Sequence, residues 1–381
     1  HRYSDSLLTA ILEGLERRCG LMPRGRRPVV RGPWRELQKY ALDPMTVGLH
    51  REEQYRQPDF PFRPFDPDRD MNWVWGYSFS RQEPILVPEQ LAYYSSAHGE
   101  GFVYETSNGC ALGGSLEEAI FYGLLEVVER DSFLLTWYAR LPLPRLDAGS
   151  ARDAELELMI ERMRAVCGFE VLMFNATMEH GIPAIWSMAI NKRGHGINLI
   201  CAAGAHPDPV RAAKSSIHEL AAMVFSQNER YEQGRQSYLR MLEDPYLVRA
   251  MEDHSMLYAL PEAQHRFNFL LESASPVQTF REAYGERSWQ PDLTADLNGL
   301  LKAIMSCGMD VIVVDQSSPE TQRNGLHCVK VIVPGMLPMT FGYHLTRLEG
   351  LDRVLNVPAR LGYAERPLAP DQLNPHPHPF P

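Results

Sequence analysis

Two segments of the chain place glutamates and an arginine at a spacing that suits divalent-cation and phosphate chemistry. Residues 13–17 and residues 126–130 both read ExxER. On a helix, positions three and four apart share one face, so each segment would present two carboxylates beside a guanidinium. Carboxylates are ligands for Mg²⁺, and arginine binds phosphate oxygens bidentately. A solvated face with an internal Glu–Arg pair is the alternative; repetition shifts the balance toward a site, although charge pattern alone does not decide.

A turn of small residues precedes the second ExxER segment. Residues 105–115 read ETSNGCALGGS and lead into a predicted helix N-terminus, where backbone N–H groups favour anions. A plain turn with a helix cap explains the same residues equally well. Glu219, on a later predicted helix, is a further candidate carboxylate, whereas His218 beside it is interpreted as a surface or core histidine. The P-loop, dinucleotide-binding, nucleophile-elbow and zincin motifs are missing from the sequence.

Three amphipathic segments are expected to position these glutamates. They span residues 4–20, 115–138 and 209–234. Ser115 and Glu118 form a capping box at the start of the second helix, and the third is expected to stop at Gly234. Shorter helices are predicted at residues 34–42, 151–166 and 297–305, and strands at residues 73–80, 84–88, 169–174, 184–189, 197–203, 310–315 and 327–334. Helices and strands interleave without strict alternation, so the sequence predicts an α+β (mixed α/β) fold in one large domain.

The composition excludes several functional classes. The chain has 381 residues, a formal net charge of −10 and six scattered cysteines without a CxxC pair. The acidic total argues against broad nucleic-acid binding, and a run of arginines at residues 24–31 is interpreted as a solvated loop. The apolar runs are too short to span a bilayer, and no secretory signal starts the sequence. A reduced, cytoplasmic protein is therefore expected, and the start at His1 suggests a piece of a longer polypeptide.

The end of the chain alternates proline with other residues. Residues 375–381 read PHPHPFP, which favours polyproline II and cannot join a helix or a central strand, because proline lacks an amide hydrogen. In isolation such a segment is typical of a disordered tail or of an SH3-type ligand. His376 and His378 would bind a metal only weakly and are interpreted as spacers.

Taken together, these segments resemble the YcaO-domain proteins. The likeness rests on YETSNGCALGGSLEEAIFYGLLEVVERDSF, on SLLTAILEGLERRCG, on the late VIVVDQSSPETQRNGLHCVKVIVPGMLPMTFGYHLTRLEGLDRVLNVPARLGY and on the PxPxP end. More narrowly, the chain is similar to the SagD-type maturases of azole- and azoline-containing peptides. The resemblance implies a YcaO-type domain over residues 1–373, an ATP site between helices and sheet, and a tail, residues 374–381, that reaches the active site.

The resemblance also implies an activity, the ATP- and Mg²⁺-dependent cyclodehydration of a ribosomally made precursor peptide. A Cys, Ser or Thr side chain attacks the preceding amide, ATP phosphorylates the amide-derived oxygen, and loss of phosphate leaves a thiazoline or oxazoline. By similarity, Mg²⁺ would be held by Glu13, Glu16, Glu126, Glu129 and Glu219. Nucleotide contacts would come from Arg17, Ser107, Asn108, Glu129 and Arg130. Catalysis would involve Glu16, Glu126, Arg130 and Pro381, whose terminal carboxylate would assist proton transfer.

Partners and alternatives follow from the same resemblance. The expected partners are a precursor peptide as substrate and a ThiF-like leader-binding protein or domain, with a flavin dehydrogenase and a homodimer as further options, and neither nucleic acid nor membrane. Ala10 and Met223 replace a serine and a glutamine of the family's usual motifs, which removes one hydroxyl and one amide contact. A YcaO-type enzyme that forms thioamides or amidines is one alternative, and the PxPxP end argues against it. A non-catalytic docking scaffold is the other, and retention of both ExxER segments argues against that.

Overall fold

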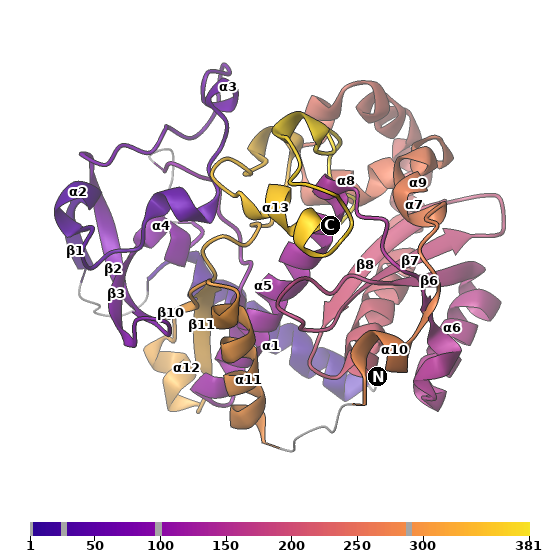
Figure 1. Cartoon of the computed structure of the whole chain (residues 1–381), viewed down its shortest axis with the longest axis horizontal. Helices are drawn as coiled ribbons and strands as arrows, with labels where there is room; N and C mark the ends of the chain where they lie inside the picture. The colour runs from indigo at the N-terminus through magenta and orange to yellow at the C-terminus, as the bar shows by residue number, and fades with distance from the viewer. Residues whose placement is uncertain (1–2, 24–28, 96–100, 287–291) are drawn as a thin grey trace. The chain divides into compact units, whose positions relative to one another are not determined.

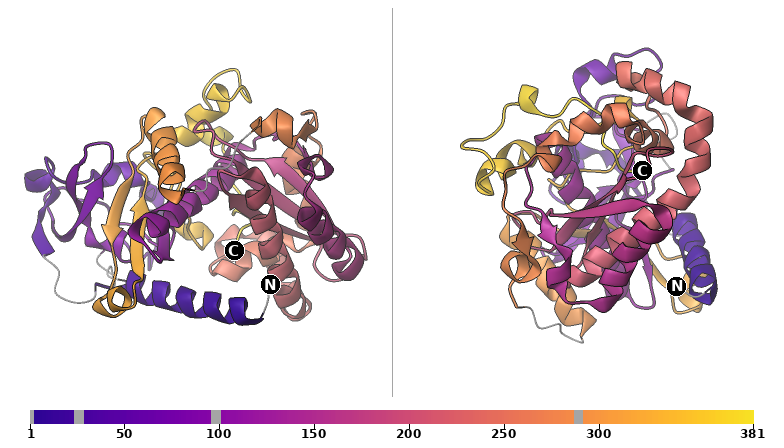
Figure 2. Two further views of the ribbon diagram at one scale, coloured as in Figure 1. Left: turned by 90° about the horizontal axis from the view of Figure 1, so that it is seen from below. Right: turned by 90° about the vertical axis from the view of Figure 1, so that its right-hand side faces the viewer.

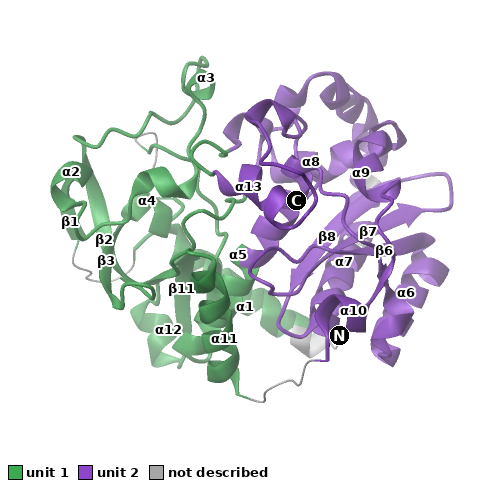
Figure 3. Cartoon of the chain, in the orientation of Figure 1, with its two compact units in different colours: residues 1–127, 290–340, 347–351 green, residues 128–289, 341–346, 352–381 purple. Residues whose placement is uncertain are grey.

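Helix α5 (Leu116–Ala139) belongs to both of the units into which the chain divides. The structure, a computed structural model, describes residues 3–23, 29–95, 101–286 and 292–381. Unit 1 comprises His1–Val127, Gln290–Thr340 and Arg347–Leu351, and unit 2 comprises Val128–Trp289, Phe341–Thr346 and Asp352–Pro381 (Figure 3). Most of the arginine run at residues 24–31 lies outside the described residues, and its last member, Arg31, belongs to strand β1.

An antiparallel sheet forms the centre of unit 1 (Figure 1). Its strand order is β1-β2-β10-β11-β4, and β3 also pairs with β2. The strands span Val29–Pro33 (β1), Asp70–Ser78 (β2), Glu83–Pro88 (β3), Cys110–Gly113 (β4), Ile312–Asp315 (β10) and His327–Ile332 (β11). Branched side chains fill the core against this sheet, since they pack well on a pleated surface: Val74, Ile85, Val87, Ile312 and Val314 are all buried.

Helix α1 (Tyr3–Leu21) and helix α5 cover opposite faces of the edge strand β4. A Cβ atom built at Gly20 of α1 would lie 3.2 Å from Cys110 Sγ. A Cβ built at Gly123 of α5 would lie 3.6 Å from Cβ of the next strand residue, Ala111. Successive strand residues point to opposite faces, so the two helices that carry the ExxER segments pack on the two sides of β4.

Unit 2 is built on an antiparallel sheet of three strands in the order β6-β7-β8. These strands span Phe169–Asn175, Ala184–Asn191 and Leu199–Ala205. The long helix α7 (Pro209–Glu243) packs against β7 and β8, as Figure 2 shows. Ser187 of β7 and Ser216 of α7 share a buried hydrogen bond of 2.6 Å, which satisfies both hydroxyls inside this contact.

Other elements connect these layers. In unit 1 they are the helices Trp34–Leu37 (α2), Glu52–Tyr55 (α3), Glu89–Ala92 (α4), Leu293–Ser306 (α11) and Pro319–Arg323 (α12). In unit 2 they are the helices Ala154–Arg162 (α6), Met251–Tyr258 (α8), Asn268–Leu271 (α9), Phe280–Tyr284 (α10) and Arg353–Arg360 (α13), and the paired strands Leu146–Asp147 (β5) and Gln278–Thr279 (β9). Within the described ranges, no helix combines the length and the apolar character that crossing a membrane requires.

The predicted mixed α+β fold is confirmed, and so are the helices that carry both ExxER segments. The predicted stop of the third helix at Gly234 is wrong, because α7 continues to Glu243. The missing side chain at Gly234 leaves room for the ring of Tyr238, whose hydroxyl donates to the carbonyl oxygen of Arg230 at 3.3 Å. Gly234 therefore serves a side-chain contact within the helix and does not end it.

Two shorter predicted helices differ in extent from those in the structure: one ends early, and the other starts late and ends in a π-helix that reaches Cys167. The helix predicted at residues 34–42 ends at Leu37. Beyond it, Leu42 N donates to the carbonyl oxygen of Leu86, a residue of β3. In the segment predicted as a helix over residues 151–166, the α-helix covers Ala154–Arg162 and a π-turn follows it. In the first case, pairing with a strand outweighs local helix propensity.

Gly109, just before β4, is expected to tolerate no side chain. Its φ is +79°, and a Cβ would lie 2.3 Å from the carbonyl oxygen of Val331. We expect Gly109→Ala to lower the free energy of unfolding by about 3 kcal/mol or more, since it combines left-handed strain with overpacking. Gly308→Ala is the control, because that glycine has φ +82° and open space around it, and it should cost about 1 kcal/mol. Equal losses in urea denaturation would contradict this packing argument.

Two buried histidines make unit 2 sensitive to acid. Burial lowers the pKa of His180 and of His254 from 6.5 to about 4. Below pH 6.5 the unfolded chain binds protons at these two positions that the folded chain does not, so their contribution to the free energy of unfolding falls as the pH drops from 6.5 to 4. At pH 5 the loss is about 2 kcal/mol for each histidine.

Urea denaturation at pH 7 and pH 5 measures this loss. His180→Gln should reduce the difference between the two pH values, whereas His195→Gln, at an exposed position, should leave it unchanged. A full pH dependence in His180→Gln would refute the assignment.

Candidate functional site

Helix α1 places the first ExxER segment beside the turn that precedes β4. Arg17 donates to Glu13 Oε1 at 3.3 Å and also to the hydroxyl of Ser107 in that turn. Glu13 is 58% exposed, whereas Glu16 faces partly inward. The structure thus brings into contact Arg17 and Ser107, two of the residues expected to touch nucleotide.

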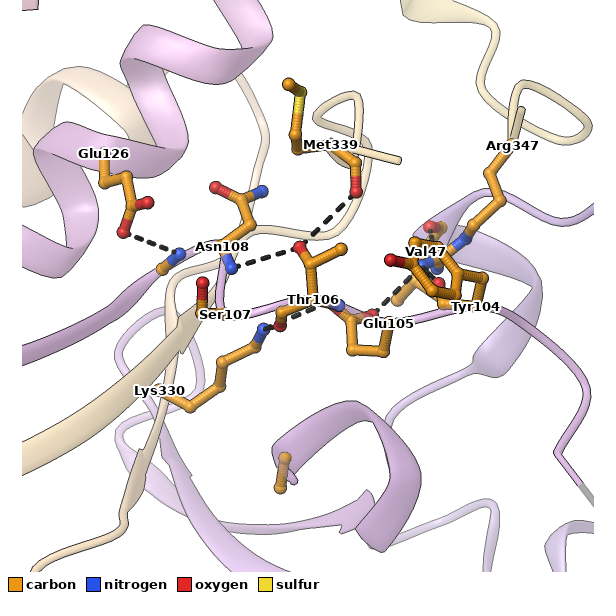
Figure 4. Close-up of polar contacts among 12 residues, drawn as sticks. Val47, Tyr104, Glu105, Thr106, Ser107, Asn108, Glu126, Lys330, Met339 and Arg347 are labelled. Carbon is orange, nitrogen blue, oxygen red and sulfur yellow. Dashed lines mark hydrogen bonds and ion pairs between the residues drawn. The ribbon is translucent and has the colours of Figure 1, made fainter. Parts of the chain in front are cut away.

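Helix α5 contributes Glu126 to the same turn. Glu126 Oε2 accepts a hydrogen bond of 3.2 Å from the backbone N–H of Gly109, as Figure 4 shows. This bond ties the carboxylate to the last residue of the Ser107–Asn108–Gly109 run, hereafter the SNG turn. The second ExxER segment therefore begins at the turn that Arg17 contacts from α1.

Glu16 and Glu126 form a like-charge pair in unit 1. Burial, together with the nearby carboxylate of Glu126, raises the pKa of Glu16 to about 7, although Arg17 acts in the opposite direction. Two partly buried carboxylates repel each other unless one is protonated or a cation lies near both. The pair therefore suits a hard divalent cation such as Mg²⁺, which takes oxygen ligands.

The protein supplies only part of a coordination sphere here. Across the part of the chain that the structure describes, no group of three or more His, Cys, Asp or Glu side chains is placed to hold a metal ion. Mg²⁺ usually binds through one or two carboxylates and fills its remaining positions with waters and phosphate oxygens. Glu16 and Glu126 fit that mode of binding.

The SNG turn also holds an amide oxygen without a protein partner. Asn108 N donates to Thr106 Oγ1 at 3.2 Å, and Thr106 Oγ1 donates to the carbonyl oxygen of Met339 at 3.5 Å. These bonds fix the backbone of the turn, but Asn108 Oδ1 is buried and has no hydrogen-bond partner among the residues that the structure describes. A buried acceptor without a partner costs free energy, so its presence is consistent with a ligand that donates to it.

Glu105, just before the turn, is held by two buried cations (Figure 4). Lys330 Nζ lies 3.0 Å from Glu105 Oε1, and Arg347 Nη1 lies 3.0 Å from Glu105 Oε2. Lys330 also donates to the carbonyl oxygen of Thr106 at 2.9 Å, and Arg347 to that of Tyr104 at 2.6 Å. Burial raises the pKa of Glu105, but the two cations outweigh burial and hold it below its usual value. This cluster was not predicted from the sequence, although a lysine within the apolar run of β11 is a visible signal.

The second half of the α5 segment lies in unit 2. Glu129 and Arg130 follow Glu126 by three and four positions, so the three side chains share one helix face. Arg130 Nε lies 4.0 Å from Glu129 Oε1, and its guanidinium lies 5.7 Å from the ring centre of Phe133. Glu219 lies on α7 and is exposed.

A buried ion network includes Asp131, the residue of α5 that directly follows the second ExxER segment. Arg353 donates to Asp131 Oδ1 at 2.6 Å and to both carboxylate oxygens of Glu179, at 2.7 and 3.0 Å. The two carboxylates raise the pKa of Arg353 above its usual value despite burial. The network joins α5 to α13 inside unit 2 and was not found from the sequence, because its members lie far apart along the chain.

The proline-rich tail is ordered within unit 2. Its residues from Pro377 to Phe380 are buried, and the terminal Pro381 is partly exposed. The ring of Phe380 stacks on Phe133 with 3.6 Å between ring centres and meets Trp186 edge-on at 4.7 Å. The interpretation of His378 as a mere spacer is wrong, since its ring stacks on His254 with 4.0 Å between centres.

The predicted residues divide between the two units. Unit 1 contains Glu13, Glu16, Arg17, Ser107, Asn108 and Glu126, which gather around the SNG turn. Unit 2 contains Glu129, Arg130, Glu219 and Pro381. Ala10, where the family's motif commonly has serine, is exposed on α1.

Solved structures with the same fold include two heterocyclases. One is described as a heterocyclase in complex with substrate and cofactor; it is 27% identical, with a TM-score of 0.77, and the match covers 97% of this chain and 48% of that one. The other is the heterocyclase TruD, 27% identical with a TM-score of 0.75, covering 98% of this chain and 50% of that one. This chain therefore spans about half the length of these heterocyclases.

A more distant structure shares the fold alone. It is YcaO from Methanopyrus kandleri bound with AMPPCP and Mg²⁺, 19% identical with a TM-score of 0.56, covering 88% of this chain and 91% of that one.

A family model described as YcaO cyclodehydratase, ATP- and Mg²⁺-binding, matches residues 1–337. That match includes both ExxER segments, the SNG turn and the strands around them, and on this basis the chain belongs to the YcaO cyclodehydratase family.

Proposed function

We propose that this chain carries out the ATP- and Mg²⁺-dependent cyclodehydration of Cys, Ser or Thr residues in a ribosomally made precursor peptide. The observation that carries the proposal is the partly buried Glu16–Glu126 pair beside the SNG turn, with the pKa of Glu16 raised to about 7. The family match and the likeness to two heterocyclases support the same activity. The product is a thiazoline or an oxazoline, formed with the loss of one water from the peptide for each ring.

In this proposal the residues of unit 1 bind the metal nucleotide. Glu16 and Glu126 hold Mg²⁺, and Glu13 supports them from the first turn of the same segment. Arg17 and Ser107 already contact each other and bind phosphate oxygens together, while Asn108 offers its unpartnered Oδ1 to a donor group of the nucleotide. MgATP, when bound, supplies the phosphoryl group that turns the amide-derived oxygen into a leaving group.

Residues of unit 2 have proposed roles of their own. Glu129 and Arg130 extend the helix face that begins at Glu126, and Arg130 stabilises negative charge as it develops on phosphate oxygens. Glu219 adds a carboxylate from α7. The terminal carboxylate of Pro381 accepts the proton that the attacking thiol or hydroxyl releases. The amide nitrogen loses its own proton as phosphate departs, which gives the C=N bond of the ring. The ordered tail, which holds Pro381 partly exposed, supports this role.

The proposed reaction also needs partners. We propose that a ThiF-like leader-binding protein or domain presents the precursor peptide, and that a flavin dehydrogenase acts where azolines are oxidised to azoles. The six cysteines are all free thiols in the structure, which suits a reducing cytoplasmic setting for the proposed enzyme.

Glu16→Gln should stabilise the metal-free chain while abolishing its response to MgATP. A raised pKa means that the Glu16 carboxylate costs the fold up to about 3 kcal/mol once the pH has risen from 4.5 through 7, and glutamine removes that charge. At pH 8 we therefore expect a higher melting temperature for the variant without ligands. With MgATP at about a hundred times its Kd, the parent gains about 2.7 kcal/mol and the variant gains none.

Thermal unfolding with and without MgATP gives both readouts. Glu117→Gln, an exposed position in the first turn of α5, is the matched control and should behave like the parent. If Glu16→Gln still shifted with MgATP, the proposed metal role would be wrong.

Glu126→Gln should abolish ring formation. The variant loses the carboxylate that accepts a hydrogen bond from the amide of Gly109 and whose charge acts on Glu16, so we expect turnover to fall by at least about a hundredfold. Mass spectrometry of a precursor peptide, with a leader-binding partner present, counts the waters lost. Undiminished water loss in Glu126→Gln, with Glu117→Gln active, would overturn the proposed function.

A further inference from the structure

The proline-rich tail lies in a part of unit 2 that offers hydrogen-bond donors to three successive backbone carbonyls. Trp137 Nε1 donates to the carbonyl oxygen of His376 at 3.0 Å, and the hydroxyl of Tyr258 donates to that of Pro377 at 2.5 Å. The third contact joins His254 Nδ1 to the carbonyl oxygen of His378 at 2.8 Å. The first donor comes from α5 and the other two from α8.

These three donors suit a segment in which every second residue is proline, because such a segment offers backbone acceptors and few donors. Pro375, Pro377, Pro379 and Pro381 have no amide hydrogen, so the tail is rich in acceptors and poor in donors. In a polyproline II helix the carbonyls turn by a third of a revolution per residue, so donors on several sides are needed to bind three in a row. Near the start of the segment, Asn374 N donates to the carbonyl oxygen of Tyr138 at 2.7 Å, and His376 N donates to Asn374 Oδ1 at 3.2 Å.

His254 is set up as a donor by its second nitrogen. Its Nε2 accepts a hydrogen bond of 2.8 Å from the backbone N–H of Gly342, so Nε2 carries no proton. In the neutral ring the proton must then be on Nδ1, which faces the carbonyl oxygen of His378. The ring is fully buried and also stacks on the ring of His378, which leaves it one orientation.

Phe380 supplies the apolar anchor of the tail. It is 2% exposed and lies between Phe133 and Trp186. Phe133 also lies beneath the guanidinium of Arg130. The three donors fix the course of the backbone up to residue 378, and the stacked ring fixes the residue just before the terminal proline.

We propose that Trp137, Tyr258 and His254 form a carbonyl-binding groove for this chain's own C-terminal segment, and that His254 and Tyr258 are positioning residues for the terminal carboxylate. The inference rests on the proposed function in one respect only, the catalytic use of the Pro381 carboxylate. The groove recognises the backbone of residues 376–378 and the ring of Phe380, so its specificity is for proline-imposed carbonyl geometry followed by an aromatic residue.

The test uses three variants of the full chain. Tyr258→Phe and His254→Leu each remove one donor, whereas His254→Asn keeps an N–H at the position of Nδ1. His265→Leu, at an exposed position near the start of α9, is the matched control. Hydrogen exchange measured by mass spectrometry reports the protection of the segment that contains residues 374–381, and the thermal shift with MgATP shows that nucleotide binding is intact.

We expect Tyr258→Phe and His254→Leu to raise amide exchange in the tail at least tenfold and to lower the kcat of ring formation by a similar factor. The KM for peptide and the MgATP shift should stay unchanged, and His254→Asn should recover most of the protection and of the rate. Tail protection equal to the parent in both Tyr258→Phe and His254→Leu would overturn the groove. Loss of protection with an undiminished rate would support the groove and refute the catalytic role of Pro381.

Discussion

The candidate site depends on two ion pairs, which join the carboxylate of Glu105 to Lys330 and to Arg347. All three side chains are buried or nearly so, and each cation also donates to a backbone carbonyl next to Glu105. A buried ion cluster of this kind adds little net stability, but removing one partner leaves a charge unpaired at a cost of about 3–5 kcal/mol. The cluster holds the backbone of residues 104–106 in one conformation. The SNG turn starts from that segment, and Arg17 and Glu126 reach the turn only where it is so placed.

The site combines groups that a purely structural design would avoid. Glu16 and Glu126 repel each other, and Asn108 keeps a buried oxygen without a protein partner. Both features reduce the stability of the chain by itself, and both are relieved by the same kind of ligand, a metal-bound phosphate compound with hydrogen-bond donors. Groups that lower the stability of the unliganded protein are expected at a ligand-binding site, because the ligand compensates for them when it binds.

Local sequence patterns predicted the helices and the residues that gather at the SNG turn, because helical spacing and capping are encoded over a few positions. The family resemblance assigned both Arg17 and Ser107 to the nucleotide, but their contact with each other was not predicted, since the two residues come from different elements. Lys330 and Arg347 were missed because a lysine in an apolar strand and an arginine in a late loop reveal no partner by themselves. The extent of α7 beyond Gly234 was missed because glycine is most often read as a helix stop, whereas here it leaves room within the helix for the tyrosine ring four residues later.

Helix α5 has a consequence of another kind. It starts in unit 1 with the capping of Ser115 and ends in unit 2 at Ala139, without a break in its hydrogen-bonded backbone. A rise of about 1.5 Å per residue sets an axial offset of about 4.5 Å between Glu126 and Glu129, whichever unit each belongs to. The helix thus fixes the spacing between two acidic residues that belong to different units. Because a helix unwinds most easily from its ends, the middle of α5, which holds both acidic positions, should be the last part of the helix to lose its hydrogen bonds.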